Sequence, residues 1–255
     1  MTGTIFGGSS EAYDRFMGRY STQLAVRFAD FAGVRAPQRA LDVGAGTGAL
    51  TEELAARLGE DNVAAAEPSS DYVATLRTRF PAADVREAPA ETLPWEDERF
   101  DSALGQLVVV FFNDAPGAAR ELVRVTRPGG VVATCMWEVE GVEMMNALNE
   151  IRRRLTPDWN ILTEYRDEAS LRTLFEEAGL RDVETTRLEV SVDYETVDEI
   201  WEPAIHVGGP GGPAVNSFSP EQLAVGREIF EEALGNPTGP YTLTGRAAAV
   251  RGVTG

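Results

Sequence analysis

The chain has 255 residues, of which 43% are hydrophobic, and its 41 acidic and 23 basic residues give a net charge of −18. A chain of this length can bury a core as one domain. Its negative field repels nucleic acid and anionic lipid surfaces, so we expect neither as a partner. All 23 basic residues are arginine, which excludes a Schiff-base lysine and the lysine of a phosphate-binding P-loop.

Targeting signals are not expected in this chain. The first ten residues lack the basic and apolar regions of a signal peptide. The longest apolar run, at 107–112, is far shorter than the ~20 residues that cross a bilayer. The single cysteine, Cys135, lies in an apolar run and is expected to be a buried thiol. We therefore expect a cytoplasmic protein.

The predicted elements begin with a helical region at 11–33. From there to residue 137 we expect strands at 40–43, 63–66, 100–104 and 131–137, helices at 49–58, 70–80 and 115–126, and a turn at 127–130. Strands that alternate with helices predict a parallel sheet with helices on both faces.

The second half of the chain has a weaker pattern. It predicts helices at 142–155, 168–178, 197–207 and 220–234, and strands at 183–194 and 241–251. Because the last two strands enclose two of these helices, we expect a helical insertion over the edge of the sheet.

A glycine-rich turn, Asp42-Val-Gly-Ala-Gly-Thr-Gly48, joins the first strand to a helix. Its alternating glycines, Gly44, Gly46 and Gly48, allow backbone amides to approach a ligand closely. The carboxylate of Asp42 can receive an amine or a hydroxyl. By itself the turn permits a dinucleotide, a phosphate or S-adenosylmethionine.

An acidic residue, Glu67, ends the second strand. An acid in this position suits the two hydroxyls of a ribose. Together with Gly44, Gly46 and Ala49 it also fits the dinucleotide-binding pattern. The two elements should meet, because ligands of open α/β sheets bind at the carboxyl ends of the strands.

Further motifs follow the turn in a fixed order: Ala90-Glu91, Leu93-Pro94-Trp95, Phe100-Asp101 and Arg127-Pro-Gly-Gly130. With the turn and Glu67, this set resembles the class I S-adenosylmethionine-dependent methyltransferases, in the branch related to ubiquinone and menaquinone biosynthesis methyltransferases. The resemblance covers about 13–137. It implies a Rossmann-like, mainly parallel seven-stranded α/β sheet of order 3-2-1-4-5-7-6, with strand seven antiparallel and helices on both faces.

The resemblance also implies a domain organisation. We expect one methyltransferase domain over 1–255, with an N-terminal helical cap at 1–36 and a cofactor-binding half at 37–137. A substrate-side half at 138–255 would carry a helical insertion at about 195–238, between the last two strands.

The implied cofactor is S-adenosyl-L-methionine, and the implied product is S-adenosyl-L-homocysteine. The expected cofactor-binding residues are Tyr13, Arg19, Asp42, Gly44, Ala45, Gly46, Gly48, Glu67, Pro68, Ser69, Ala90, Glu91, Gln106 and Leu107. By resemblance, Asp42 receives the ammonium group and Glu67 the ribose hydroxyls. Tyr13 or Arg19, in the segment before the sheet, would reach the carboxylate.

The adenine side departs from the family pattern. Family members often carry Gly-Asp or Gly-Ser where this chain has Ala88-Pro89. Because proline offers no amide, the adenine would be recognised through Ala90 or Glu91, beside Pro68 and Ser69. Gln106 and Leu107 would line the cofactor near the methyl group.

The implied reaction is in-line transfer of a methyl group to a small-molecule acceptor, with no catalytic residue assigned. His206 is the only histidine and is a candidate general base, although methyl transfer can also work by positioning alone. One cysteine, one histidine and no acid pairs at ligand spacing predict no metal site. The alternatives are a nicotinamide-dependent oxidoreductase and a non-enzymatic S-adenosylmethionine-binding protein. The sequence pattern predicts neither the acceptor nor an oligomeric state.

Overall fold

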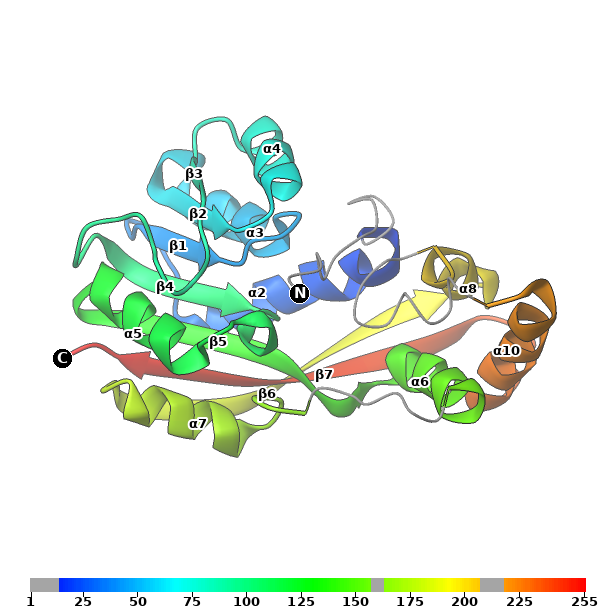
Figure 1. Ribbon diagram of the computed structural model, residues 1–255. Coiled ribbons are helices and arrows are strands. Elements are labelled where there is room, and N and C mark those ends of the chain that lie inside the picture. The colour runs from blue at the N-terminus through cyan, green and yellow to red at the C-terminus, as the bar shows by residue number, and fades with distance from the viewer. Residues whose placement is uncertain (1–13, 157–162, 207–217) are drawn as a thin grey trace. The chain divides into compact units, whose positions relative to one another are not determined.

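A seven-stranded sheet forms the centre of the fold (Figure 1). The structure is a computed structural model that describes residues 14–156, 163–206 and 218–255. The strand order is β3-β2-β1-β4-β5-β7-β6, which confirms the order implied by the resemblance. The strands are β1 (Ala40–Val43), β2 (Val63–Glu67), β3 (Asp84–Glu87), β4 (Phe100–Gln106), β5 (Thr126–Val142), β6 (Arg181–Tyr194) and β7 (Tyr241–Val253).

The direction of the strands decides where a ligand can bind. β1 pairs in parallel with both β2 and β4, and β3 and β5 extend the parallel part on either side. In Figure 1 the arrow of β7 points opposite to that of β6, so the sheet is mixed. The chain order reverses between β1 and β4, and the carboxyl ends beside such a switch point form the usual ligand site of this architecture.

The helices agree closely with those expected from the sequence. The helical elements are the π-helix η1 (Asp14–Gly18), α2 (Arg19–Ala32), α3 (Ala49–Leu58), the 3-10 helix η2 (Glu60–Asn62), α4 (Ser70–Arg79), the 3-10 helix η3 (Val109–Phe111), α5 (Ala115–Val125), α6 (Glu143–Leu155), α7 (Glu168–Glu177), α8 (Asp198–Ala204) and α10 (Pro220–Ala233). α8 and α10 lie between β6 and β7 in the chain, which confirms the helical insertion.

Strand β2 shows why helices cover both faces of the sheet. Successive side chains of a strand point to opposite faces, and every residue of β2 is buried. Ala64 and Ala66 belong to a core cluster that contains Leu122 of α5. Ala65 belongs to a second cluster, which contains Leu76 of α4. Because both faces of β2 are buried, its sequence lacks the alternation of apolar and polar residues, as is usual for the strands of parallel sheets.

The chain divides into two compact units. Unit 1 comprises Met1–Tyr20, Glu140–Leu162 and Glu189–Gly245, and unit 2 comprises Ser21–Val139, Thr163–Leu188 and Arg246–Gly255. Strands β5, β6 and β7 each run from one unit into the other. The expectation of a single domain, divided at 1–36, 37–137 and 138–255, stays a prediction.

Within unit 1, α6 packs against α10. Gly226 lies in this contact: a Cβ there would be 3.3 Å from Cγ2 of Ile151 and 3.5 Å from the ring of Trp201. Trp201 in turn packs on Phe230, with ring centroids 5.6 Å apart. Unit 1 therefore has an apolar interior of its own.

Strand β3 was not expected from the pattern of residues, although the resemblance implied a strand there. Its sequence, Asp-Val-Arg-Glu, has Val85 as its one apolar and one buried residue. β3 lies at the edge of the sheet, beside β2 alone. An edge strand needs little apolar patterning, because much of its surface faces water.

The expected turn at 127–130 lies inside strand β5, so the prediction of a separate turn was wrong. Phe100 of β4 pairs with Thr126, whereas Ser102 pairs with Val131. Between these two pairs β5 contains more residues than β4, so the pairing of the strands is irregular there, as at a β-bulge. Thr254 holds this segment by accepting a bond from the backbone N–H of Gly130, at 3.1 Å. The turn residues thus form an irregularity within a strand that is longer than expected.

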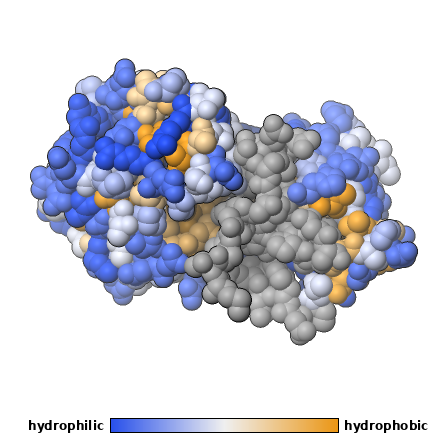
Figure 2. Space-filling model, turned by 45° about the horizontal axis from the view of Figure 1, so that its top comes forward, coloured by the Kyte–Doolittle hydropathy of each residue, from blue (hydrophilic) through white to orange (hydrophobic). Residues whose placement is uncertain are grey.

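The surface agrees with the composition. Figure 2 shows a face on which most described residues are hydrophilic and the hydrophobic areas are small. Within the part of the chain that the structure describes, we find no helix with the length and hydropathy of a membrane span. Cys135 is buried, which confirms the expected buried thiol, and burial raises the pKa of its thiol above the usual range.

Candidate functional site

The glycine turn follows β1 and is hydrogen-bonded to the end of β2. The N–H groups of Gly44 and Ala45 both donate to the carbonyl of Ala66, at 2.8 and 3.2 Å. Gly44, Gly46 and Gly48 have φ values of 71°, 55° and 97°. This left-handed region costs other residues about 1–2 kcal/mol, so the backbone path itself favours glycine at three positions.

The three glycines differ in what surrounds them. A Cβ at Gly44 would lie 2.2 Å from Cγ2 of Val108, and a Cβ at Gly48 would lie 2.7 Å from Cε2 of Phe80. Packing inside the protein therefore requires both. A Cβ at Gly46 would meet nothing within 4 Å. The open space beside Gly46 suits a ligand that lies against the backbone.

The carboxylate of Glu67 is held in one orientation at the end of β2. Its side chain is buried, with 6% exposure. The N–H of Gly46 donates to Oε2 and the N–H of Ser69 donates to Oε1, both at 2.9 Å. Burial raises the pKa of Glu67, although both backbone bonds favour the charged form. Each oxygen keeps lone pairs that can accept further donors such as ribose hydroxyls.

Asp42 lies at the corresponding end of β1 and is 1% exposed. The hydroxyl of Thr51 donates to its Oδ2 at 2.6 Å. Burial raises the pKa of Asp42 to about 7, the bond from Thr51 lowers it, and the negative charge of Glu67 raises it further.

Two buried carboxylates thus face the same part of the site. A cationic ligand would stabilise both charged forms, whereas a diphosphate would be repelled. These two acceptor groups fit a cofactor that carries an ammonium group, a sulfonium and a ribose, and they fit the diphosphate of a dinucleotide poorly.

The loop after β3 approaches the same edge of the sheet. The N–H of Ala88 donates to the carbonyl of Glu67 at 3.1 Å, and Ala90 is buried. Oε1 of Glu91 accepts bonds from the N–H groups of Asn113 and Asp114, at 2.7 and 3.2 Å. The carboxylate of Glu91 therefore ties this loop to the start of α5.

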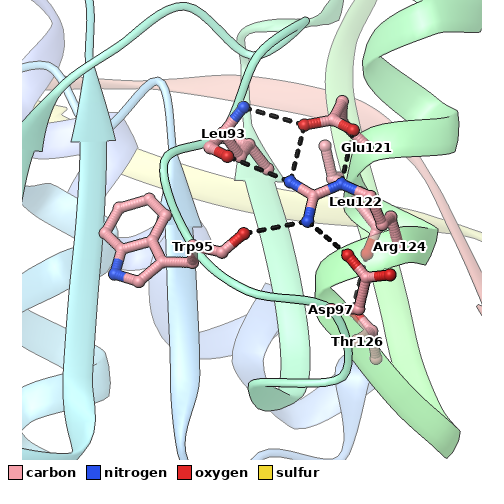
Figure 3. A network of polar contacts seen from close by, with 7 residues as sticks. All are labelled: Leu93, Trp95, Asp97, Glu121, Leu122, Arg124 and Thr126. Carbon is pink, nitrogen blue, oxygen red and sulfur yellow. Dashed lines mark hydrogen bonds and ion pairs between the residues drawn. The ribbon is translucent and has the colours of Figure 1, made fainter.

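A second polar network holds the continuation of the loop on α5 (Figure 3). The guanidinium of Arg124 donates to the carbonyls of Leu93 and Trp95, at 3.0 and 2.8 Å. It also binds the carboxylates of Glu121 and Asp97, at 2.6 and 2.7 Å. Glu121 accepts a bond from the N–H of Leu93 at 2.9 Å. Arg124 thereby orders a segment that has no regular secondary structure.

Gln106 is the last residue of strand β4, on the other side of β1, and Leu107 follows it. Nε2 of Gln106 donates to the carbonyl of Ser21 at 3.0 Å. Leu107 has a left-handed φ of 60°, and its N–H donates to the carbonyl of Cys135 at 2.9 Å. The strained residue directs the next side chain, Val108, against Gly44. Such backbone strain is concentrated at functional sites.

Of the remaining candidates, Arg19 and His206 lie among the described residues. Arg19 belongs to unit 1, where its guanidinium is 3.0 Å from the carboxylate of Glu199 and lies over the ring of Tyr194. Tyr13 lies outside the described residues. His206 is exposed and follows α8. The roles of Tyr13 and Arg19 at the cofactor, and of His206 as a base, stay predictions.

Comparison with known families indicates the cofactor of this site. A family model described as "Methyltransferase domain" matches residues 41–134, which include the glycine turn, Glu67, the loop after β3 and Gln106. The chain belongs to the class I S-adenosylmethionine-dependent methyltransferases. The cofactor of this methyltransferase family is S-adenosylmethionine. The narrower branch stays a prediction.

Individual relatives agree with the family. An uncharacterized protein of Mycobacterium bovis is 29% identical over 204 residues, which are 75% of this chain and 72% of the relative. A malonyl-[acyl-carrier protein] O-methyltransferase of Pectobacterium atrosepticum is 33% identical over 128 residues, which are 50% of this chain and 49% of the relative. This methyltransferase therefore matches about half of that relative.

A solved structure shares the fold. The structure of a putative type II methyltransferase from Anaeromyxobacter dehalogenans has a TM-score of 0.64 and 21% identity, and the match covers 90% of this chain and 95% of that chain.

The methyltransferase fold brings most of the expected cofactor residues to one edge of the sheet in unit 2. The expected residues at the carboxyl ends of β1, β2 and β4, and in the segments after β1, β2, β3 and β4, are Asp42, Gly44, Ala45, Gly46, Gly48, Glu67, Pro68, Ser69, Ala90, Glu91, Gln106 and Leu107. Their contacts with the cofactor stay predictions.

Three residues of the site were not expected from the sequence: Thr51, Val108 and Arg124. For Thr51 a signal was available, because it shares the buried stripe of α3 with Leu54 and Leu58. A polar residue on an apolar stripe indicates a buried partner. Val108 and Arg124 act through tertiary contacts, and no spacing in the sequence reveals them.

Proposed function

We propose that this methyltransferase transfers a methyl group from S-adenosylmethionine to a small-molecule acceptor. The observation that carries the proposal is the orientation of the Glu67 carboxylate by the N–H groups of Gly46 and Ser69. Burying a carboxylate costs free energy unless it has hydrogen-bonding or charged partners. Here the carboxylate is fixed beside a glycine turn that has open space at Gly46.

Each side of the site has a role in binding. Asp42 would hold the ammonium group of the cofactor, and Glu67 would hold its ribose hydroxyls. The loop after β3, fixed by Glu91 and Arg124, would form the adenine side. S-adenosylmethionine supplies the chemistry when bound, as a methyl group attached to a positively charged sulfur. The chain contributes orientation of the cofactor and a site from which water is excluded, and these can provide several kcal/mol.

The nature of the acceptor is part of the proposal. The charge of −18 disfavours nucleic acid as an acceptor. The name of the relative from Pectobacterium atrosepticum describes an O-methyltransferase, so oxygen acceptors deserve the first tests. An acceptor panel should include carboxylic acids, hydroxyl compounds and amines, with formation of S-adenosylhomocysteine as the readout.

Cofactor binding tests the proposal directly. S-adenosylhomocysteine at roughly 100 times its dissociation constant should stabilise the protein by about 2.7 kcal/mol, and NAD should not. Glu67→Gln should weaken binding of S-adenosylhomocysteine by about 10- to 100-fold, because it removes hydrogen bonds to a charged acceptor. Calorimetric titration measures this loss.

A matched control lies on the next strand. Glu87 pairs in register with Glu67 but is exposed, so Glu87→Gln should bind S-adenosylhomocysteine as the wild type does. Stabilisation by NAD and not by S-adenosylhomocysteine would contradict the proposed cofactor. Unchanged affinity in Glu67→Gln would contradict the assignment of the ribose site.

A further inference from the structure

Thr51 makes an unusual contact for a threonine near the start of a helix. Its side chain is 0% exposed, and its hydroxyl donates to Oδ2 of Asp42 at 2.6 Å. Its backbone N–H also lowers the pKa of the same carboxylate. One residue of α3 therefore acts on Asp42 through both its hydroxyl and its backbone.

The two threonines of α4 bond their own helix. The hydroxyls of Thr75 and Thr78 in α4 donate to the carbonyls of Asp71 and Ala74, four residues earlier, at 3.1 and 3.0 Å. This is the usual local bond of a helical threonine. Thr51 bonds a residue of another element instead.

The carbonyl that a local bond of Thr51 would use binds another side chain. The carbonyl four residues before it belongs to Thr47, and this carbonyl accepts a bond from Nη1 of Arg79 on α4. Arg79 is fixed in turn by Glu52, with 2.9 Å between Nη2 and the carboxylate. The hydroxyl of Thr51 has Asp42 as its partner instead.

We infer that Thr51 is a positioning residue, which holds the Asp42 carboxylate in the orientation that receives the cofactor. The inference rests on the proposed function, in which Asp42 binds the ammonium group. Glu67 on β2 is the charged group that acts on Asp42, and its effect opposes ionisation. Burial opposes it as well. The bonds from Thr51 oppose both effects, so Thr51 keeps the pKa of Asp42 from rising further above about 7.

Thr51→Val tests this role, because valine has nearly the shape of threonine and lacks the hydroxyl. Binding of S-adenosylhomocysteine is measured by calorimetry from pH 6 to pH 8.5 for the wild type, Thr51→Val and Thr51→Ser. In the wild type, affinity should rise with pH as Asp42 ionises around pH 7. In Thr51→Val the rise should move upward by about one pH unit, with affinity at pH 7 reduced about tenfold or more. Thr51→Ser should restore the wild-type profile.

Two other outcomes would overturn the inference alone, and a third would overturn the proposed function as well. A wild-type pH profile in Thr51→Val would overturn the inference alone. An equal loss of affinity at every pH would also overturn it, because that pattern indicates a packing defect and not a change at Asp42. Failure of the wild type to bind S-adenosylhomocysteine at any pH would overturn the proposed function, and the inference with it.

Discussion

The substitution Gly46→Ala separates the needs of the fold from those of the ligand. Gly44 and Gly46 both have a left-handed backbone, with φ values of 71° and 55°. A Cβ at Gly44 would lie 2.2 Å from Val108, and a Cβ at Gly46 would meet no protein atom within 4 Å. Replacement by alanine should therefore reduce stability most at Gly44 and ligand affinity most at Gly46.

The expected magnitudes follow from these contacts. Gly46→Ala should cost about 1–2 kcal/mol of stability, from the backbone conformation alone. Gly44→Ala carries the same backbone cost and must also displace Val108, which adds about 1–3 kcal/mol. In Gly46→Ala the new methyl group occupies the space that the cofactor should use. A similar overpacking cost would then weaken binding by about 5- to 150-fold.

Two measurements on both variants test this reasoning. Urea unfolding gives the free energy of unfolding, and calorimetric titration gives the affinity for S-adenosylhomocysteine. We expect Gly46→Ala to remain folded and bind weakly, and Gly44→Ala to lose more stability. Wild-type affinity in a folded Gly46→Ala protein would refute the idea that a ligand lies against this backbone.

Two further predictions concern stability. Arg124→Met should destabilise the protein by about 2–4 kcal/mol, because the part-buried carbonyls of Leu93 and Trp95 and the carboxylate of Glu121 lose their donor. Arg120→Met on the same helix should cost less than about 0.5 kcal/mol, since Arg120 makes one exposed ion pair, and equal losses in urea unfolding would contradict this account. Burial raises the pKa of Asp42 from 3.8 to about 7 in the folded state, so the folded protein keeps a proton that the unfolded chain releases. Stability without cofactor should therefore fall as pH rises from about 4 to about 7, and Asp42→Asn should lack this component. A wild type and an Asp42→Asn variant with the same pH dependence would exclude Asp42 as the cause.

Local sequence patterns were sufficient to predict an element whose own apolar residues repeat with the period of a strand or a helix. The glycine turn joins an apolar run to an amphipathic helix, and the structure has β1 and α3 at those places. Local patterns failed where contacts with neighbouring segments determine the secondary structure. β3 exists because β2 offers it hydrogen bonds at the sheet edge, and the segment 127–130 stays within β5 because Thr254 binds it.

The sequence by itself determined the family, the order of the elements and the two acids that end β1 and β2, because motifs and periodicity are local properties of a chain. Only the tertiary structure showed that the two carboxylates are buried near one another, that Thr51 donates to Asp42 and that Arg124 holds the loop after β3. These contacts join residues that are distant along the chain. Their charge states and orientations depend on burial and on partners supplied by other elements, which no local pattern contains.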